Sequence, residues 1–383
     1  MEKLEEFLKN REELGLLRRL RPAESRSGGR IDFAGREYLD FSSNDYLGLS
    51  GHPKLKQAAT AAIEKFGVAS CASRLLSGDA QIFHQLEDAV AKFKGKAAAL
   101  IFNSGYQANV GIISALFSKG DCIFSDRFNH ASIIDGMLLS QAKIFRFRHN
   151  DCQHLESFLI KERNKFKNVL IVTESIFSMD GDRAPLKELV RLKEKYHCQI
   201  MVDEAHATGI FGENGSGLVE EEGLSARIDL IMGTFSKALA GFGAYLATSK
   251  TIADYLVNTC RSFIYSTALP PAVIACNLAS LKLIKDEPQR RKALLSLSER
   301  LRVRLTGLGF CVPGSSQIIP VILGDNLRTL EFAKKVQAKG YWVLPVRPPT
   351  VPAGQARLRL SLSYYHNQET VDKLIDVISE IRI

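Results

Sequence analysis

The sequence is informative first through what it lacks. No apolar run approaches the roughly 18 residues of a membrane-spanning helix, and no low-complexity tract occurs. The seven cysteines stand far apart and form no CxxC pair, so neither a disulfide framework nor a zinc knuckle is expected. The first twenty residues carry five Glu and no signal-peptide core, which argues against a transit peptide or a secretory signal. These absences predict a protein of the reducing cytoplasm, with no membrane partner and no metal site.

A strong excess of one charge is also missing. The chain has 51 Lys and Arg against 42 Asp and Glu, a net charge of +9. The basic residues are mixed with acidic ones along the whole chain and form no stripe with interleaved aromatics, which disfavours a nucleic-acid partner. An anionic phosphate cofactor and acidic substrates account for a mild positive excess equally well.

The length of 383 residues and the apolar share of 45% predict two lobes with a large core. The amphipathic first twenty residues are expected to form a docking helix, and residues 31–41 a hairpin that turns at Ala34-Gly35. The predicted domains are an N-terminal helix and hairpin arm (1–43), a large domain (44–283) and a small C-terminal domain (284–383).

Between residues 98 and 247, strand-like runs alternate with helix-like runs. The predicted strands are 98–102, 122–125, 143–147, 169–173, 199–202, 230–233 and 244–247, and helices are expected at 107–118, 130–140, 152–164 and 186–196. This alternation predicts an α/β fold with a mostly parallel sheet that is covered on both faces. The sequence leaves open whether the last of these strands runs antiparallel.

The pattern changes around Pro270-Pro271. A long helix is expected at 272–285, followed by a charged segment at 286–292 and a further helix. Strands are then predicted at 317–323, 342–345 and 357–362, with helices at 327–339 and 370–381. This mixture predicts a small α+β lobe, and no internal repeat is visible.

Two loops hold the residues that point most clearly to chemistry. Asp203 and His206 follow the strand at 199–202, and Lys237 follows the strand at 230–233. Because ligands bind at the carboxyl edge of an open α/β sheet, these side chains are expected to meet there. A lysine that forms a Schiff base and a carboxylate that pairs with a pyridinium nitrogen suit a pyridoxal phosphate (PLP) site. The cationic ring nitrogen would keep Asp203 ionised, and His206 could hydrogen-bond the phenolate oxygen.

Each of these residues also has a simpler interpretation. The DExH string occurs in helicases, but no GxxxxGK[ST] loop accompanies it here. An Asp at a strand end is often a helix N-cap, and His206 could be a structural histidine. Lys237 is distinguished by its position after an apolar strand, between small hydroxyl residues and glycines. Such a site excludes water, which favours the neutral amine that Schiff-base chemistry requires.

Other loops at strand ends could complete the site. Thr234 and Ser236 could donate to a phosphate or simply cap their own loop. Gly105 and Tyr106 open a helix after the strand at 98–102, and the amides at such a helix start bind anions, although a single Ser-Gly turn is weak evidence. His130 could lie on a pyridine ring or only begin a helix. Ser178, in another loop after a strand, is equally ambiguous.

Seven motifs stand in the order seen in the α-oxoamine synthases: residues 44–49, 104–109, 129–132, 177–181, 203–206, 234–237 and 265–267. Over about residues 40–367 the chain therefore resembles this family, a branch of the fold-type I PLP-dependent transferases. The resemblance implies a large domain with a mostly parallel seven-stranded sheet and a smaller α+β C-terminal domain.

The resemblance also implies a role for individual residues. Lys237 would hold PLP, Asp203 would pair with the pyridinium, His206 would bond the phenolate oxygen, and His130 would stack on the ring. The remaining cofactor contacts that it implies are Gly105, Tyr106, Ser178 and Thr234, with Ser266 and Thr267 reaching the phosphate from the partner subunit of a homodimer. The substrate contacts that it implies are Arg18, Asn44, His130, Thr350 and Arg359.

The alternating run at 356–360 bears independently on Arg359. Arg357 and Arg359 would share one face of a strand, with leucines on the other face. An Arg fork suits a substrate carboxylate, whereas Arg357 is more simply explained by a solvated strand face.

The implied reaction is a decarboxylating condensation of an amino acid with an acyl thioester. Ala184-Pro185 and the segment 347–352 most resemble the branch that joins L-alanine to a pimeloyl thioester, carried by coenzyme A or acyl carrier protein, and opens biotin assembly. A branch that uses glycine and an acetyl thioester, one that makes 5-aminolevulinate, and a catalytically inactive partner subunit are the alternatives. Lys237 argues against the inactive subunit, which has no need of it. Cys71-Ala72 departs from the Gly-Gly of many relatives, so the resemblance does not define the backbone path or the substrate preference near that loop, whereas the implied cofactor chemistry is unaffected.

Overall fold

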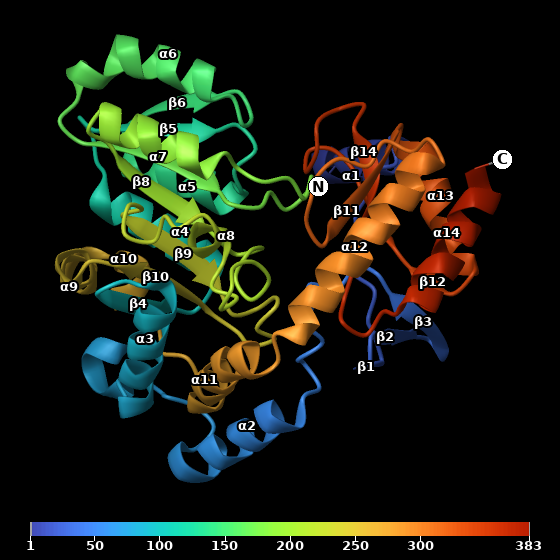
Figure 1. Ribbon diagram of the computed structural model, residues 1–383, viewed down its shortest axis with the longest axis horizontal. Helices are drawn as coiled ribbons and strands as arrows, with labels where there is room; N and C mark the ends of the chain where they lie inside the picture. Colours follow the sequence, from blue (N-terminus) through green and yellow to red (C-terminus); the bar gives the residue numbers. More distant parts are fainter. Residues whose placement is uncertain (1, 383) are drawn as a thin grey trace. The chain divides into compact units, whose positions relative to one another are not determined.

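A computed structural model describes residues 2–382, with side chains described through residue 381 (Figure 1). Backbone contacts divide the chain into two units. Unit 1 contains residues 1–48, 178–182 and 292–383, and unit 2 contains residues 49–177 and 183–291. The N-terminal arm that the sequence predicts thus belongs to the same unit as most of the predicted C-terminal domain. The predicted boundaries themselves remain predictions.

Unit 2 is built on one seven-stranded sheet in the order β4-β10-β9-β8-β7-β5-β6. Its strands are β4 (Ala98–Phe102), β5 (Cys122–Asp126), β6 (Lys143–Phe147), β7 (Val169–Glu174), β8 (Gln199–Asp203), β9 (Leu230–Thr234) and β10 (Ala244–Thr248). Adjacent strands from β6 to β9 pair parallel, whereas β10 pairs antiparallel with both β9 and β4. The expected α/β class and mostly parallel sheet are confirmed, and the orientation left open for 244–247 is antiparallel.

Helices cover both faces of this sheet (Figure 1). The helices of this unit are α2 (Pro53–Phe66), α3 (Gln81–Lys94), α4 (Gly105–Leu116), α5 (Ala131–Ser140), α6 (Cys152–Glu162), α7 (Leu186–Lys195), α8 (Leu218–Glu221), α9 (Lys250–Thr259), α10 (Arg261–Ile264) and α11 (Pro271–Asp286). On one face, alternate strand residues such as Leu170 and Val172 join Ile112 of α4 and Leu256 of α9 in a continuous buried cluster. Strands buried on both faces explain the near-continuous apolar runs that mark this half of the sequence.

Unit 1 has two small sheets. One has the order β1-β2-β3-β12, and the other has the order β11-β14-β13. Their strands are β1 (Ser25–Ser27), β2 (Arg30–Phe33), β3 (Arg36–Asp40), β11 (Ile318–Gly324), β12 (Tyr341–Trp342), β13 (Leu344–Val346) and β14 (Ala356–Ser361), and the helices are α1 (Glu2–Glu13), α12 (Gln289–Gly307), α13 (Asn326–Ala338) and α14 (Gln368–Arg382). The expected hairpin is confirmed, with positive φ at both Ala34 and Gly35. The single strand expected at 342–345 is wrong, because β12 and β13 belong to different sheets.

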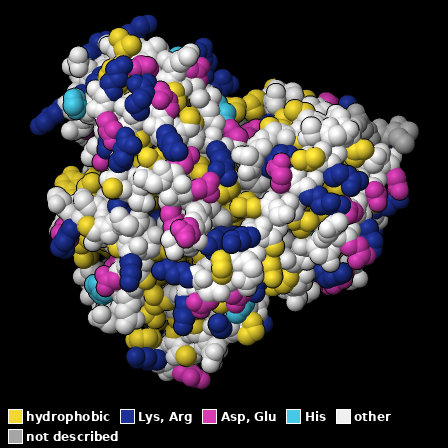
Figure 2. Space-filling view, in the orientation of Figure 1, with side chains coloured by type: hydrophobic (Ala, Val, Ile, Leu, Met, Phe, Trp, Pro, Cys, Tyr) yellow, Lys and Arg dark blue, Asp and Glu magenta, His cyan; other side chains and the backbone are white. Residues whose placement is uncertain are grey.

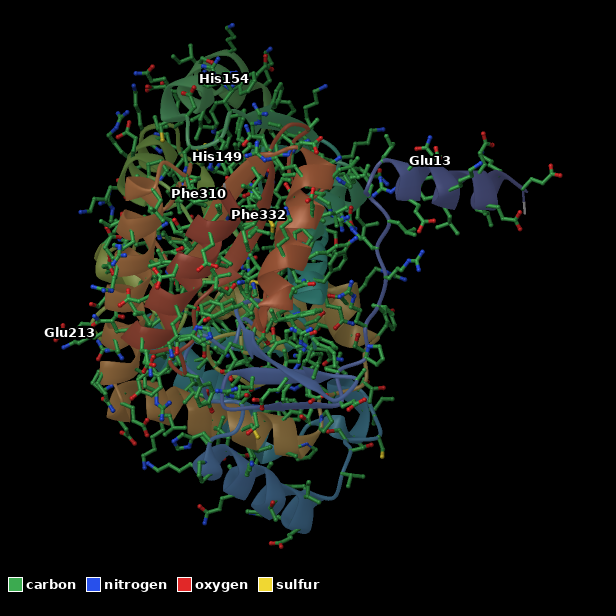
Figure 3. All side chains as sticks on the ribbon, turned by 90° about the vertical axis from the view of Figure 1, so that its right-hand side faces the viewer. Glu13, His149, His154, Glu213, Phe310 and Phe332 are labelled. Carbon is green, nitrogen blue, oxygen red and sulfur yellow. The ribbon has the colours of Figure 1, made fainter. Side chains whose placement is uncertain are left out.

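The amphipathic segment at the start of the chain is only partly helical. Helix α1 ends at Glu13, and residues 16–23 continue without regular structure. Figure 3 shows this helix with side chains pointing outward on every side up to the labelled Glu13. None of its residues is buried, and Leu4, Phe7 and Leu8 are each more than half exposed. The expected docking helix is thus shorter than predicted.

The surface agrees with the mixed charge pattern of the sequence. In the face drawn in Figure 2, Lys and Arg side chains are interspersed with Asp and Glu. Among the described residues, no helix is both long and apolar enough to cross a membrane.

Candidate active site

The ends of β8 and β9 bring three of the predicted residues together. Asp203 is the last residue of β8, His206 follows in the next turn, and Lys237 follows β9. The Nζ atom of Lys237 lies 2.8 Å from Nε2 of His206. Asp203 and His206 are buried and Lys237 is half-buried. The sheet edge therefore presents an amine and an imidazole in direct contact, with a carboxylate on the neighbouring strand.

The carboxylate of Asp203 is fixed by its neighbours. Its Oδ1 accepts the main-chain N–H of Ala205 at 2.8 Å, and its Oδ2 accepts a hydrogen bond from Nδ2 of Asn109 at 2.9 Å. Asn109 lies on α4 and is buried, and its own Oδ1 has no hydrogen-bond partner among the described residues. Asp203 is thus held in one orientation by two donors, one on each carboxylate oxygen.

His130 is the N-cap residue of α5. Its Nδ1 accepts the main-chain N–H of Ser132 at 3.2 Å and lies 2.8 Å from the Ser132 hydroxyl. With Nδ1 used as an acceptor, the proton of the neutral ring belongs on Nε2. Burial lowers the pKa of His130, and Lys237 also lowers it, while the charge of Asp203 acts in the opposite direction. Because the side chain keeps an exposed surface, the neutral ring can face a ligand with an Nε2–H donor.

The predicted phosphate site lies at the start of α4. Ser104 caps this helix, and its side chain accepts the N–H of Gln107 at 3.2 Å. The first helical amides, those of Gly105 and Tyr106, have no acceptor within the helix, so this end favours an anion. The Tyr106 hydroxyl contacts the Asp135 carboxylate, and half of the Tyr106 side chain is exposed.

Three further residues that the sequence predicts as cofactor contacts lie near this helix start or on β9. The Gln107 amide donates to Ser266 Oγ at 3.3 Å, and the main-chain oxygen of Thr267 accepts from Asn103 at 2.8 Å, all within one chain. Thr234 is buried, and its hydroxyl donates to the main-chain oxygen of Gly243 at 2.8 Å. The expected roles of Thr234, Ser266 and Thr267 at a phosphate remain predictions.

Asn44, Ser178 and Arg359 come together within unit 1. The Arg359 guanidinium donates to the main-chain oxygen of Ser178 at 2.6 Å and lies 3.4 Å from Oδ1 of Asn44. Arg359 is buried on β14, and no carboxylate pairs with it among the described residues. A buried guanidinium without a counter-charge is expensive, which suits a residue that binds a substrate carboxylate.

A cavity of about 540 Å³ lies within unit 1, and Arg18 and Thr350 line it together with Arg21, Trp342 and Arg347. Arg18 donates to the Thr350 hydroxyl at 2.8 Å, and the Arg21 guanidinium lies 5.4 Å from the Trp342 ring centroid. Burial lowers the pKa of Arg347, and the nearby charges of Arg18 and Arg11 lower it further. None of the lining residues is acidic, so the cavity favours an anionic ligand.

Arg357 differs from its prediction. Instead of a solvated position, it has a buried side chain that is only 1% exposed. Its guanidinium pairs with Asp180 at 2.6 Å. All six residues of β14 are buried, so both of its faces are covered, and the alternating sequence of Arg and Leu does not mark a solvated face.

Sequence reasoning missed Glu174, Asn109 and Ser132 as members of this site. Glu174 ends β7 as Asp203 ends β8, and the two residues are register partners. Its Oε1 accepts the main-chain N–H of His130 at 2.6 Å. The position of Glu174 at a strand end was the available signal, because the same rule selected Asp203.

The residues present fit pyridoxal phosphate. Lys237 supplies an amine for the aldehyde, Asp203 a carboxylate for the ring nitrogen, and His206 an imidazole next to that amine. The start of α4 supplies amides for the phosphate. Asp203 and Lys237 both act electrostatically on His130 and Glu174, which places all four groups around one point.

This fold and donor set define a PLP-dependent transferase of fold type I. Residues 36–378 match the model of the aminotransferase class I and II family, and the chain belongs to that family. Within it, the chain is an α-oxoamine synthase, a member of a group of PLP-dependent acyltransferases.

Named relatives cover almost the whole chain. It is 48% identical to an 8-amino-7-oxononanoate synthase of Geotalea daltonii, over 100% of this chain and 98% of the relative, and 47% identical to one of Geobacter sulfurreducens, over 96% and 95%. A serine palmitoyltransferase from S. paucimobilis with bound PLP matches with a TM-score of 0.93 and 31% identity, over 99% of this chain and 96% of that one. The 8-amino-7-oxononanoate synthase of Francisella tularensis matches with a TM-score of 0.77 and 31% identity, over 90% and 97%.

Proposed function

We propose that this protein is an 8-amino-7-oxononanoate synthase. It would condense L-alanine with a pimeloyl thioester of coenzyme A or acyl carrier protein, with loss of CO₂ and release of the thiol. The observation that carries the proposal is the placement of Lys237, His206 and Asp203 at adjacent strand ends, in a chain whose named relatives share this activity.

The cofactor, when bound, supplies an electron sink for the pair of electrons left at Cα of the amino acid. Lys237 would hold PLP and then act as the base that takes the Cα proton. Asp203 would stay ionised against the ring nitrogen, held by Asn109 and by the amide of Ala205. His206, in contact with the Lys237 amine, would orient the oxygen next to the aldehyde.

His130 would act on the acyl substrate. Its Nδ1 is occupied by Ser132, so its Nε2–H is the group available to the thioester carbonyl oxygen. A hydrogen bond to this oxygen becomes stronger as charge develops on it during attack by Cα. The new carbon–carbon bond forms at that carbonyl carbon, the thiol leaves with a proton, CO₂ departs from the alanine carboxylate, and Cα is reprotonated.

The two ends of the substrate pair carry carboxylates, and unit 1 has two candidate partners for them. Arg359, buried without a counter-charge next to Asn44 and Ser178, suits the amino-acid carboxylate. Arg18 with Thr350, next to Arg347 in the basic cavity, suits the distal carboxylate of the pimeloyl chain. Apolar lining residues such as Leu16 and Leu330 would cover the methylenes between them.

A homodimer is part of the proposal. Exposed apolar side chains are frequent on unit 2, and the largest exposed fractions include Leu76 at 82%, Tyr265 at 73%, Leu138 at 63% and Leu139 at 61%. Exposed apolar residues of this size favour an interface between copies of the chain. Tyr265 directly precedes Ser266 and Thr267, the residues proposed to reach the partner's phosphate site.

A thioester panel tests the substrates. Purified protein loaded with PLP is offered L-alanine or glycine with pimeloyl, acetyl or succinyl thioesters, while thiol release and CO₂ are measured. L-alanine with the pimeloyl thioester should give the highest kcat/KM. Turnover confined to glycine with the acetyl thioester would replace the proposed substrates by those of the sister branch.

The proposed role of Lys237 has its own test. Borohydride treatment of the PLP-loaded protein should fix a pyridoxyl group on Lys237, detectable by peptide mass spectrometry. Lys237→Ala should lose both this adduct and steady turnover. Full activity in that variant, or an adduct on another lysine, would contradict the assignment.

A further inference from the structure

Glu174 is a buried carboxyl group at the centre of the site, to which the reaction as proposed assigns no role. It is the last residue of β7, is 4% exposed, and is the register partner of Asp203 on β8. No Lys or Arg forms an ion pair with it among the described residues. A carboxyl group in such a position needs an explanation, because burial of a carboxylate without a counter-charge is costly.

The contact that Glu174 makes is with His130. Its Oε1 accepts the main-chain N–H of His130 at 2.6 Å. His130 is the N-cap of α5, so this hydrogen bond fixes the residue from which the helix starts and from which the imidazole projects. A displacement of the His130 main chain would move the ring and its Nε2–H together.

The same imidazole is linked to Asp203 by side chains of two helices. His130 Nδ1 lies 2.8 Å from Ser132 Oγ. The Asn109 side-chain amide then donates both to Ser132 Oγ and to Asp203 Oδ2, each at 2.9 Å. Ser132 and Asn109 are each only 1% exposed. Glu174 and Asp203 are thus linked in two ways. They are register partners on adjacent strands, and each is hydrogen-bonded toward His130: Glu174 through the His130 main chain, and Asp203 through Asn109, Ser132 and the imidazole.

We propose that Glu174 is a positioning residue: in its uncharged form it accepts the His130 main-chain N–H, and so holds the imidazole and its Nε2–H in the direction needed to act on the acyl substrate. The inference rests on the proposed function in one respect: it takes His130 as the residue that hydrogen-bonds the carbonyl oxygen of the acyl substrate.

The charges around Glu174 support the uncharged form. Burial and the charge of Asp203 together raise the pKa of Glu174 to about 8, against the opposing effects of Lys237 and of the His130 N–H. Asp126 at the end of β5 is a further acidic neighbour. Near pH 7 the carboxyl group therefore keeps its proton, and its carbonyl oxygen can still accept the His130 N–H. Two adjacent carboxylates would otherwise repel each other at the ring nitrogen.

The experiment compares Glu174→Gln with Glu174→Leu in the PLP-loaded protein. Gln keeps an acceptor oxygen and no charge, so it should retain most of the wild-type kcat at pH 7. Leu removes the acceptor and should lower kcat about 10- to 100-fold, with KM for alanine and the cofactor absorbance little changed, because only the His130 geometry is disturbed. Glu222→Gln is the matched control, since burial also raises the pKa of Glu222, which caps α8, and its kcat should equal that of wild type.

Unchanged kcat in Glu174→Leu would overturn the positioning role. A loss in Glu174→Gln as large as in Glu174→Leu would show that the negative charge, and not the acceptor, is what matters.

A second measurement does not depend on turnover or on correct folding of the Leu variant. A carboxyl group whose pKa is raised on folding stabilises the fold at low pH, and this stability is lost as pH rises through about 8. In the PLP-free chain, the wild-type Tm should therefore fall more between pH 5 and pH 9 than the Tm of Glu174→Gln. Equal slopes would contradict the uncharged form. If no thioester is turned over by wild type, the proposed function fails, while this pH dependence still decides the state of Glu174.

Discussion

Lys94 and Glu204 form an enclosed ion pair beneath the candidate site, with Nζ of Lys94 2.8 Å from Oε2 of Glu204. The two side chains are 1% and 0% exposed. Lys94 also donates to the Thr208 hydroxyl at 3.2 Å, and Glu204 Oε1 accepts the N–H of Val219 at 2.8 Å. Glu204 lies between Asp203 and His206 in the chain. The pair therefore anchors the turn that carries two proposed cofactor residues to the end of α3.

We expect Lys94→Met to destabilise the fold by about 3–5 kcal/mol, because it leaves the Glu204 charge buried without its partner. The double variant Lys94→Met with Glu204→Gln should lose less, since no charge then remains to be buried. Urea unfolding of the PLP-free chain measures both. Lys250→Met is the control, because Lys250 pairs with Asp254 on the surface and should change stability by less than about 1 kcal/mol. Equal losses in the two single variants would contradict the enclosed pair.

The proposed role of Arg359 predicts that its geometry matters as well as its charge. A guanidinium can bind a carboxylate with two parallel hydrogen bonds, which the ammonium of Lys cannot do. Arg359→Lys should therefore lower kcat/KM for L-alanine about 10- to 100-fold, mainly through KM. Steady-state kinetics with the pimeloyl thioester at saturation measures this. Arg300→Lys, which affects a partly exposed ion pair with Asp372 in the same unit, should leave kcat/KM unchanged. A normal KM in Arg359→Lys would remove Arg359 from the amino-acid site.

The basic cavity predicts selectivity for an acyl chain that ends in a carboxylate. Arg347→Met should lower kcat/KM for the pimeloyl thioester about 10- to 100-fold and that for the heptanoyl thioester, which has no distal carboxylate, much less. Arg30→Met is the matched control, because Arg30 pairs with Glu37 on the surface of the same unit and does not line the cavity. Equal losses of kcat/KM with both thioesters in Arg347→Met would show that the cavity does not bind the distal carboxylate.

Strand ends were the part of the site that could be predicted from sequence. Asp203 and Lys237 follow apolar runs that could only be buried strands, and parallel strands bring their carboxyl ends to one edge. Glu174 obeys the same rule and was missed, because the prediction for this segment selected Ser178, four residues later. Its importance comes from the register of β7 against β8 and from the N–H of His130, and neither is local in sequence.

Arg357 shows where sequence periodicity gives the wrong answer. Alternation of Arg and Leu along a strand normally indicates one solvent-exposed face and one buried face. Here a partner from far along the chain, Asp180, neutralises the guanidinium, and both faces of β14 are buried. The short strands β1 and β12 were missed for a related reason. They are two or three residues long and exist only through pairing with β2 and β3.

The stability of the fold should also depend on pH through His366. Its ring stacks on Phe41 with centroids 3.9 Å apart, and burial lowers its pKa to about 4. The unfolded chain takes up the proton near the usual pKa of about 6.5, so stability is lost as pH falls below that value toward 4, by up to about 3 kcal/mol. His366→Asn should flatten the dependence of unfolding free energy on pH between 6.5 and 4.5. An unchanged slope would show that the ring is protonated in the folded state.

A homodimer with shared sites makes a prediction that a monomeric site does not. Lys237→Ala and the double variant Ser266→Ala with Thr267→Val should each have little activity alone. If Ser266 and Thr267 serve the partner's site, a mixed dimer has one site with both defects and one intact site. Random exchange makes half of the dimers mixed, so activity should recover to about a quarter of wild type.

Within the single chain, Ser266 lies 3.3 Å from Gln107 at the start of α4, so the alternative is that it serves its own site. In that case no mixed site is intact, and mixing the two inactive variants under conditions of subunit exchange would restore nothing. Light scattering of the mixture, before and after exchange, verifies that dimers are present in both cases.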